Sequence, residues 1–199
     1  MVHEQRSTGS KTYRRALNQQ LVIMNNLSKP FKNSYWLLPD KILAGEVPVG
    51  GDEIFTRKKI ESLLGVGIRV FINLLYNEPF EYAKILKQIA KEQGITCDYL
   101  HYPILDMGVP ENTEMKSILD AIDRSLEEGK SVYYHCYAGL GRTGLVSCCW
   151  LARHENLPPD QIFELLNQIR KEQNHMEYWD SPQSQIQYDF VTNWQDLPF

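Results

Sequence analysis

Short apolar runs alternate along the chain with longer stretches in which apolar residues recur at helical spacing. The apolar runs have the length and composition of β-strands and occupy Tyr35–Leu38, Ile42–Ala44, Val70–Leu75, Cys97–Tyr102 and Ser131–Tyr134. The run Val70–Leu75 is continuously apolar except for one asparagine, which is typical of a strand that is covered on both faces of a parallel sheet.

The helical pattern falls between these runs. It predicts helices over Asp52–Leu64, Pro79–Gln93, Asn112–Glu128, Leu145–Ala152, Asp160–Lys171 and Ser184–Asn193. Gly94 and Gly129 follow two of these stretches at the position of a C-terminal cap. Strands that alternate with helices indicate an α/β fold, which we expect to be a single domain with a mainly parallel central sheet flanked by helices.

We expect this domain to span residues 31–199. Residues 1–30 begin with a polar tip and continue with Tyr13, Leu17, Leu21 and Met24 at helical spacing. This pattern predicts an N-terminal extension that is partly disordered or forms a docking helix.

The most informative local sequence is the run His135–Gly144, which joins the last predicted strand to an apolar helix. Five residues separate Cys136 from Arg142, and two of them are glycines. Backbone N–H groups in such a loop can face an anion together, and the following helix N-terminus adds partial positive charge. A cysteine at this place should lose its proton readily. The loop therefore suits both the binding of a phosphoryl group and nucleophilic attack on it.

The side chains of the loop fit these two tasks. The planar guanidinium of Arg142 matches two equatorial phosphoryl oxygens, and His135 is placed to orient the loop. We expect the phosphate to be bound by the intervening residues, which are Tyr137, Ala138, Gly139, Leu140 and Gly141. The competing interpretation is a buried structural cysteine beside a glycine turn.

This run resembles the signature HCxxGxxR[ST] of the cysteine-dependent protein phosphatases, and its Tyr-Ala-Gly-Leu-Gly filling is most similar to dual-specificity members, including the cell-cycle subgroup. The resemblance covers roughly residues 36–190. It implies a phosphocysteine intermediate on Cys136, clamping of the transition state by Arg142, and a Thr143 hydroxyl that helps the thiolate to leave. It also implies hydrolysis of phosphotyrosine and, with a shallow pocket, of phosphoserine and phosphothreonine in a catalytic domain over residues 31–199.

Phosphoryl transfer to sulfur also needs a proton for the leaving oxygen, which a carboxylic acid on a loop usually supplies. Asp106 follows a predicted strand in a loop with glycine and proline, thirty residues before Cys136. Members of the family place their general acid in a loop of this type at about this distance. The alternative is an aspartate that only forms the turn. Gln183 and Gln187 resemble the glutamines that position the hydrolytic water in some relatives, although a polar helix start has the same appearance.

Composition narrows the alternatives. The net charge of −4 gives no basic surface for nucleic acid, and the longest apolar run near the start is too short to span a membrane. The four cysteines lack the spacing of a disulfide framework or a zinc site, so we expect neither a metal nor another cofactor. A nucleophilic thiolate needs reducing surroundings, so we expect the protein to act in the cytoplasm. We also expect a monomer whose partner is a phosphorylated protein substrate.

Two other functions use the same loop. One is a phosphoinositide or inositol-phosphate phosphatase, which the absence of lysine between Cys136 and Arg142 disfavours. The other is a non-catalytic module that binds phosphoproteins, although such relatives typically lack the cysteine or the acid.

Overall fold

The computed structural model describes residues 28–77, 81–173, 175–176 and 178–196. The strands are β1 (Ser34–Leu38), β2 (Ile42–Gly45), β3 (Ile68–Leu75), β4 (Asp98–Ile104) and β5 (Ser131–His135). The helices are α2 (Glu53–Gly65), α3 (Tyr82–Glu92), α4 (Asn112–Glu127), α5 (Gly141–Glu155), α6 (Pro159–Glu172) and α7 (Gln185–Asn193). Every predicted strand and helix of the domain is present. The helix predicted within residues 1–30 lies almost wholly outside the described residues.

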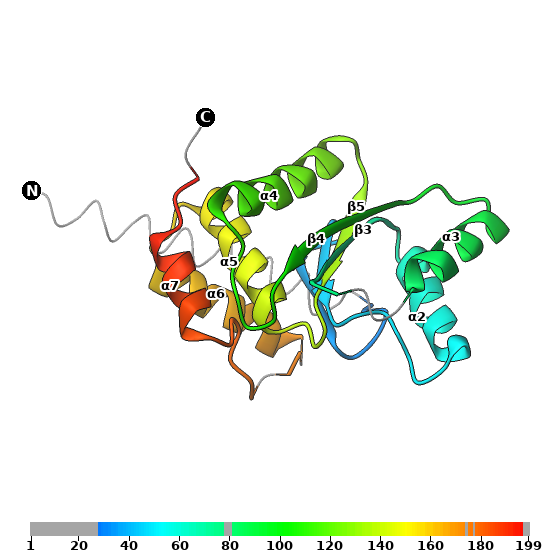
Figure 1. Cartoon of the computed structure of the whole chain (residues 1–199), viewed down its shortest axis with the longest axis horizontal. Coiled ribbons are helices and arrows are strands. Elements are labelled where there is room, and N and C mark those ends of the chain that lie inside the picture. Colours follow the sequence, from blue (N-terminus) through cyan, green and yellow to red (C-terminus); the bar gives the residue numbers. More distant parts are fainter. Residues whose placement is uncertain (1–27, 78–80, 174, 177, 197–199) are drawn as a thin grey trace, which may run out of the picture.

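The five strands form one sheet in the order β1-β2-β5-β3-β4 (Figure 1). The edge strand β1 runs antiparallel to β2, whereas the pairs β2–β5, β5–β3 and β3–β4 are parallel. This confirms a single α/β domain with a mainly parallel sheet flanked by helices. The central strand β5 leads directly into the loop that carries Cys136, so the candidate chemistry lies at the carboxyl end of the sheet.

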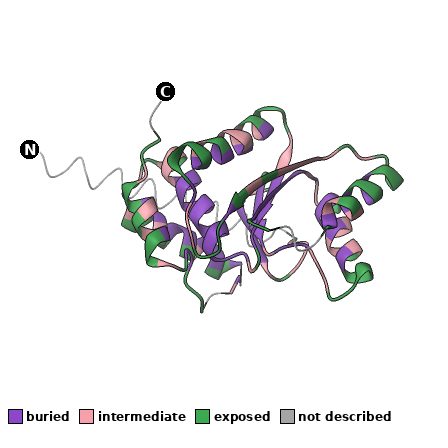
Figure 2. Cartoon of the chain, in the orientation of Figure 1, coloured by how far each residue is buried: buried purple, intermediate pink, exposed green. Residues whose placement is uncertain are grey.

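Helices cover both faces of the sheet, and the alternation of side chains along each strand fills two separate cores (Figure 2). On β5, Val132 and Tyr134 pack toward α4, α5 and α6, whereas Tyr133 faces α2 and α3. All three side chains are fully buried. The sheet is therefore held rigidly from both sides just before the loop begins.

Helix α5 begins earlier than the apolar pattern predicts, at Gly141 in place of Leu145. Apolar periodicity misses the first turn because glycine, arginine and threonine occupy it. This difference places Arg142 and Thr143 inside the helix, where their positions are fixed by its backbone. Buried residues then continue without interruption to Leu151.

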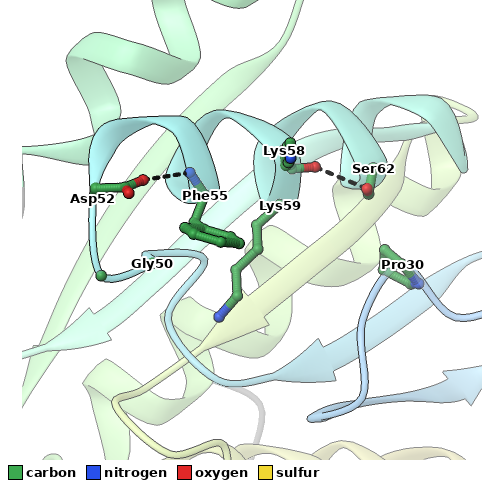
Figure 3. A pocket seen from close by; sticks show the side chains of 8 residues that line it. Pro30, Gly50, Asp52, Phe55, Lys58, Lys59 and Ser62 are labelled. Atoms are coloured by element: carbon green, nitrogen blue, oxygen red, sulfur yellow. Dashed lines mark hydrogen bonds between the residues drawn. The ribbon is translucent and has the colours of Figure 1, made fainter.

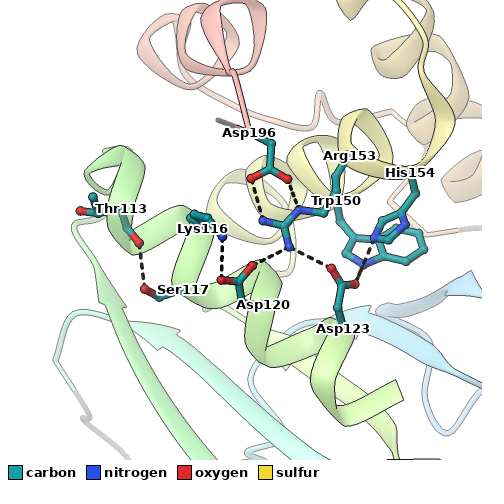
Figure 4. A network of polar contacts seen from close by, with 9 residues as sticks. All are labelled: Thr113, Lys116, Ser117, Asp120, Asp123, Trp150, Arg153, His154 and Asp196. Carbon is teal, nitrogen blue, oxygen red and sulfur yellow. Dashed lines mark hydrogen bonds and ion pairs between the residues drawn. The ribbon is translucent and has the colours of Figure 1, made fainter. Parts of the chain in front are cut away.

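A cluster of ion pairs joins α4, α5 and the segment after α7 (Figure 4). The Arg153 guanidinium contacts Asp120 at 3.0 Å, Asp123 at 2.8 Å and both carboxylate oxygens of Asp196. Asp123 also accepts a hydrogen bond from the Trp150 indole at 2.9 Å. Arg153 lies near the end of α5 that is distant from the Cys136 loop. Its contacts therefore hold the segment after α7 against that end of the helix.

The segment after α6 is held by buried polar side chains. The Gln173 amide pairs with both backbone groups of Trp36 in β1, at 2.8 and 2.9 Å. Arg170, only 2% exposed, donates to the carbonyl oxygens of Met176 and Trp179 and to Nδ1 of His175. These bonds fix the chain that continues to residues 181–183, which approach the loop of Cys136.

Burial and the neighbouring Arg170 charge lower the pKa of His175 from 6.5 to about 3. Between these values the unfolded chain binds a proton that the folded protein does not bind, so folding stability falls as the pH falls below about 6.5. We expect His175 to remove about 2 kcal/mol of unfolding free energy between pH 7 and pH 5.

Urea unfolding at these two pH values, with His175→Gln as the matched variant, measures this effect. Glutamine keeps a hydrogen-bond acceptor for Arg170 but does not titrate, so the variant should lose less stability on acidification than the wild type. The same pH dependence in both proteins would contradict the assignment.

Candidate active site

The loop between β5 and α5 is tied by hydrogen bonds to the first turn of α5. The Cys136 N–H donates to Thr143 Oγ1 at 2.9 Å, and the Gly144 N–H donates to the Leu140 carbonyl at 2.8 Å. We call residues 136–142 the phosphate loop. The last two residues of the phosphate loop, Gly141 and Arg142, lie in the first turn of α5. The N–H groups at the start of a helix have no partner within the helix. The backbone of the phosphate loop is thereby suited to an anion.

Thr143 places its hydroxyl beside the sulfur of Cys136. Thr143 Oγ1 lies 3.1 Å from Cys136 Sγ and 3.3 Å from the carbonyl oxygen of Gly45. A hydroxyl has one proton, so it can donate to the sulfur or to the carbonyl but not to both in full. Because Thr143 is fully buried, a negatively charged sulfur would attract this proton without competition from bulk water.

His135 contacts the backbone of the phosphate loop at the Cys136 carbonyl. Its Nδ1 lies 3.0 Å from the Cys136 carbonyl, and its Nε2 lies 2.6 Å from the hydroxyl of Tyr82 in α3. A carbonyl oxygen only accepts, so Nδ1 carries the proton and Nε2 accepts from Tyr82 in the neutral ring. The ring is fully buried, and it stacks on Tyr133.

Asp106 and Arg142 form an ion pair across the site. Arg142 Nη2 lies 2.8 Å from Asp106 Oδ1, and Arg142 Nη1 donates to the carbonyl of Ile104 at the end of β4. The arginine side chain is 6% exposed, whereas that of Asp106 is 79% exposed. The cation is therefore built into the protein, and the carboxylate extends into solvent from its loop.

A cavity of about 440 Å³ brings most of the predicted site residues together. Cys136, Arg142 and Asp106 line it, with Tyr137, Ala138, Gly141 and Gln183; the other lining residues are Leu75, Tyr76, Asn77, Leu105 and Met107. Gly139 and Leu140 do not line the cavity. Gly139 has a φ of +76° and packs against Gly45, and the carbonyl of Leu140 accepts a hydrogen bond from Ser181. These two residues shape the loop.

The two candidate glutamines differ in their surroundings. The Gln187 amide oxygen accepts from the N–H groups of Gln183 and Ser184, and its Nε2 donates to the Gly108 carbonyl at 3.0 Å. Gln187 thus caps α7 and ties it to the loop of Asp106. Gln183 lines the cavity, and a Cβ on Gly141 would lie 3.1 Å from its Oε1.

Several supporting residues were not predicted from the sequence. Tyr82 bonds His135 from another helix, and the buried hydroxyl of Ser181 holds the Leu140 carbonyl at 2.9 Å. Ser147 donates to the Thr143 carbonyl and contacts the hydroxyls of Tyr35 and Tyr134. The local sequence gives no signal for these contacts. A tyrosine on a helix face or a serine near a turn acquires its partner only when the chain folds.

A second hollow, of about 640 Å³, lies along α2 and lacks the groups for this chemistry (Figure 3). Its two lysines are Lys58, which lies over the Phe55 ring, and Lys59, whose ammonium group pairs with Glu46. Within the described residues, no group of three histidine, cysteine or acidic side chains could hold a metal ion. The same part of the chain contains no helix long and apolar enough to cross a lipid bilayer.

Comparison with known proteins decides the family. The model of the family Tc-R-P, described as "Polymorphic toxin system, DSP-PTPase phosphatase", matches residues 50–156, which include the loop of Asp106 and the whole phosphate loop. The chain belongs to this phosphatase family. It is thus a member of the cysteine-dependent tyrosine and dual-specificity phosphatase superfamily, as the resemblance of its loop implies.

Individual proteins similar to the phosphatase agree with this placement. Protein tyrosine phosphatase domain-containing protein 1 of Mus musculus is 32% identical over 139 residues, or 64% of this chain and 18% of that protein. Phosphatidylglycerophosphate phosphatase PTPMT1 of Arabidopsis thaliana is 28% identical over 151 residues, or 75% of this chain and 41% of that protein. The phosphatase thus spans less than half the length of either relative.

The fold of the phosphatase is also found among solved structures. The crystal structure of kinase associated phosphatase superimposes with a TM-score of 0.61 at 22% identity, and the match covers 80% of this chain and 90% of that one. This likeness supports the arrangement of helices around the sheet.

Gly139 provides a test of the loop geometry. A Cβ at this position would lie 2.4 Å from the carbonyl carbon of Gly45, whereas one on Gly129, which has a similar φ of +73°, would meet nothing within 4 Å. Gly129→Ala should cost about 1 kcal/mol of unfolding free energy from its backbone conformation alone. Gly139→Ala should cost more and should also abolish hydrolysis of an aryl phosphate, since the phosphate loop must move.

Denaturant unfolding and turnover of the two variants measure this difference. Equal stability losses with full activity in Gly139→Ala would show that the contact with Gly45 does not shape the site.

Proposed function

We propose that this phosphatase hydrolyses phosphotyrosine, and also phosphoserine and phosphothreonine, in proteins through a phosphocysteine intermediate on Cys136. The convergence of Cys136, Arg142 and Asp106 on one cavity carries this proposal. A nucleophile, a cation for the phosphoryl oxygens and a proton donor are the three groups that the reaction needs.

In the first step, the Cys136 thiolate attacks phosphorus. The S–P bond forms while the bond from phosphorus to the substrate oxygen breaks, and that oxygen takes a proton from the Asp106 carboxylic acid. Arg142 and the backbone N–H groups of the loop hold the equatorial oxygens. Asp106 contacts Arg142 at 2.8 Å, so a phosphoryl group competes with this carboxylate for the guanidinium. The exposed Asp106, freed from Arg142, takes up a proton from solvent and turns as the carboxylic acid toward the leaving oxygen.

In the second step, water attacks the phosphocysteine. Asp106 accepts the proton of the water, the S–P bond breaks, and inorganic phosphate leaves. The Thr143 hydroxyl, 3.1 Å from Cys136 Sγ, donates to the departing thiolate. Gln183 lines the cavity and is the candidate to position the water, whereas the amide of Gln187 is occupied by backbone groups.

The charge of the cavity favours phosphoproteins as substrates. Arg142 is the one cationic side chain among the residues that line the cavity, and it faces Asp106. A single phosphoryl group finds a partner there, but further phosphates on an inositol ring do not. A phosphoinositide or inositol phosphate is the second candidate substrate, and the likeness to the Arabidopsis phosphatidylglycerophosphate phosphatase supports a phospholipid.

A reducing compartment suits this mechanism, and we place the protein in the cytoplasm as a monomer. All four cysteines are free thiols, and Cys148 and Cys149 are fully buried in α5. Burial raises the pKa of both of these thiols, which keeps them protonated and inert. The two cysteines of α5 therefore do not compete with Cys136 as nucleophiles.

One panel of substrates tests this proposal. It contains a phosphotyrosine, a phosphothreonine and a phosphoserine peptide of otherwise identical sequence, together with soluble inositol phosphates, and phosphate release is measured with a chelator present. We expect turnover of the peptides to exceed that of inositol phosphates at least tenfold. Faster turnover of inositol phosphates would contradict the substrate class, and binding without turnover would indicate a non-catalytic module.

Two variants in the same panel test the assigned roles. Cys136→Ser should lose activity on every substrate. Asp106→Asn should lose more activity on phosphoserine than on phosphotyrosine, because an alkoxide leaves less readily than a phenoxide without a proton. An equal loss on both peptides would contradict the assignment of Asp106 as general acid.

A further inference from the structure

Exposed apolar side chains gather at the mouth of the catalytic cavity. Nine large hydrophobic residues are exposed in the described part of the chain, and four of them line this cavity. These are Tyr76, Leu105, Met107 and Tyr137, with exposures of 55%, 58%, 46% and 60%. We call these four residues the apolar collar. A contiguous group of exposed apolar residues beside a site is typical of a surface that binds a partner.

The collar is assembled from three separate segments. Tyr76 follows β3, Leu105 and Met107 stand on either side of Asp106, and Tyr137 follows Cys136. Three parts of the chain that are distant in sequence therefore present apolar groups around the same opening. The collar includes the sequence neighbours of Asp106 and Cys136, so a substrate that reaches these two groups must contact the collar.

The turn that carries half of the collar is held in a strained form. Met107 has a φ of +57°, which is unfavourable for a residue with a side chain. The Gly108 N–H bonds to the Leu105 carbonyl at 3.0 Å, and Ser184 at the start of α7 donates to the Met107 carbonyl at 2.7 Å. The turn is thus fixed from outside, with an apolar residue on each side of Asp106.

Charge at the mouth distinguishes between possible occupants. Among the twelve lining residues only Arg142 and Asp106 are charged, and they pair with each other. An acidic substrate segment therefore finds no free cation there and meets a carboxylate. Binding to an anionic membrane surface generally relies on lysine and arginine around the apolar contact, and the lining lacks them.

We propose that the apolar collar binds apolar side chains that flank the phosphorylated residue of a substrate protein. This inference rests on the proposed function and specifies its substrate class: extended segments with leucine, isoleucine or phenylalanine beside the phosphorylated residue, in preference to acidic segments. The burial of one such side chain against the collar should raise kcat/KM about tenfold.

Two phosphotyrosine peptides of equal length test the proposal, one with leucine and isoleucine flanks and one with aspartate and glutamate flanks. Free phosphotyrosine serves as a substrate without flanks. The wild type should have a kcat/KM about tenfold higher for the apolar peptide. The double variant Tyr76→Ser, Leu105→Ser should reduce this ratio to near one, whereas Phe55→Ser, an equally exposed residue on α2, should leave the ratio unchanged.

The outcomes separate this inference from the proposed function. Equal turnover of both peptides would overturn the role of the collar while the phosphatase activity stands, as would an unchanged ratio in the double variant. No turnover of any of the three substrates would overturn both. Phosphatidylcholine vesicles that contain phosphatidylglycerophosphate form a further arm, and faster turnover of this lipid than of the apolar peptide would overturn the assignment of a protein segment to the collar.

Discussion

The hydrogen bond from the Cys136 N–H to Thr143 Oγ1 closes the phosphate loop, and the arrangement of the site depends on it. Thr143 accepts this bond from the backbone of Cys136 and lies 3.1 Å from its sulfur, so one side chain fixes the loop and contacts the proposed nucleophile. Buried structure holds both partners of this bond in place. Two buried cores hold β5, and the buried first turns of α5 hold Thr143.

The ion pair between Arg142 and Asp106 joins the phosphate loop to the loop that follows β4. In an empty cavity the carboxylate satisfies a guanidinium that is 6% exposed and would be costly to leave unpaired. In the proposed mechanism, a phosphoryl group offers the same cation more charge and a matching geometry, which releases Asp106. The ion pair with Arg142 also explains how a highly exposed carboxylate is kept close to the phosphate loop.

Local patterns predicted the strands and helices of the fold and singled out candidate site residues, most of which the structure brings to one cavity. The run from His135 to Thr143 combines strand, glycine turn and helix start, and the position of Asp106 in a Gly- and Pro-containing loop pointed to an acid. Tyr82, Ser181 and Arg170 escaped prediction because their partners lie in other segments. The early start of α5 escaped because apolar periodicity does not register a turn of Gly141, Arg142 and Thr143.

Detection of phosphate on Cys136 during turnover tests the central claim most directly. A single turnover of a phosphotyrosine peptide is quenched with acid, and the digested protein is examined by mass spectrometry. We expect a phosphorylated peptide that contains Cys136 in the wild type and in Thr143→Ser, which keeps the hydroxyl that closes the loop, and much less of it in Thr143→Val, whose loop loses that bond. Phosphate release with no phosphorylated Cys136 in any of these proteins, or phosphate on another residue, would contradict this claim.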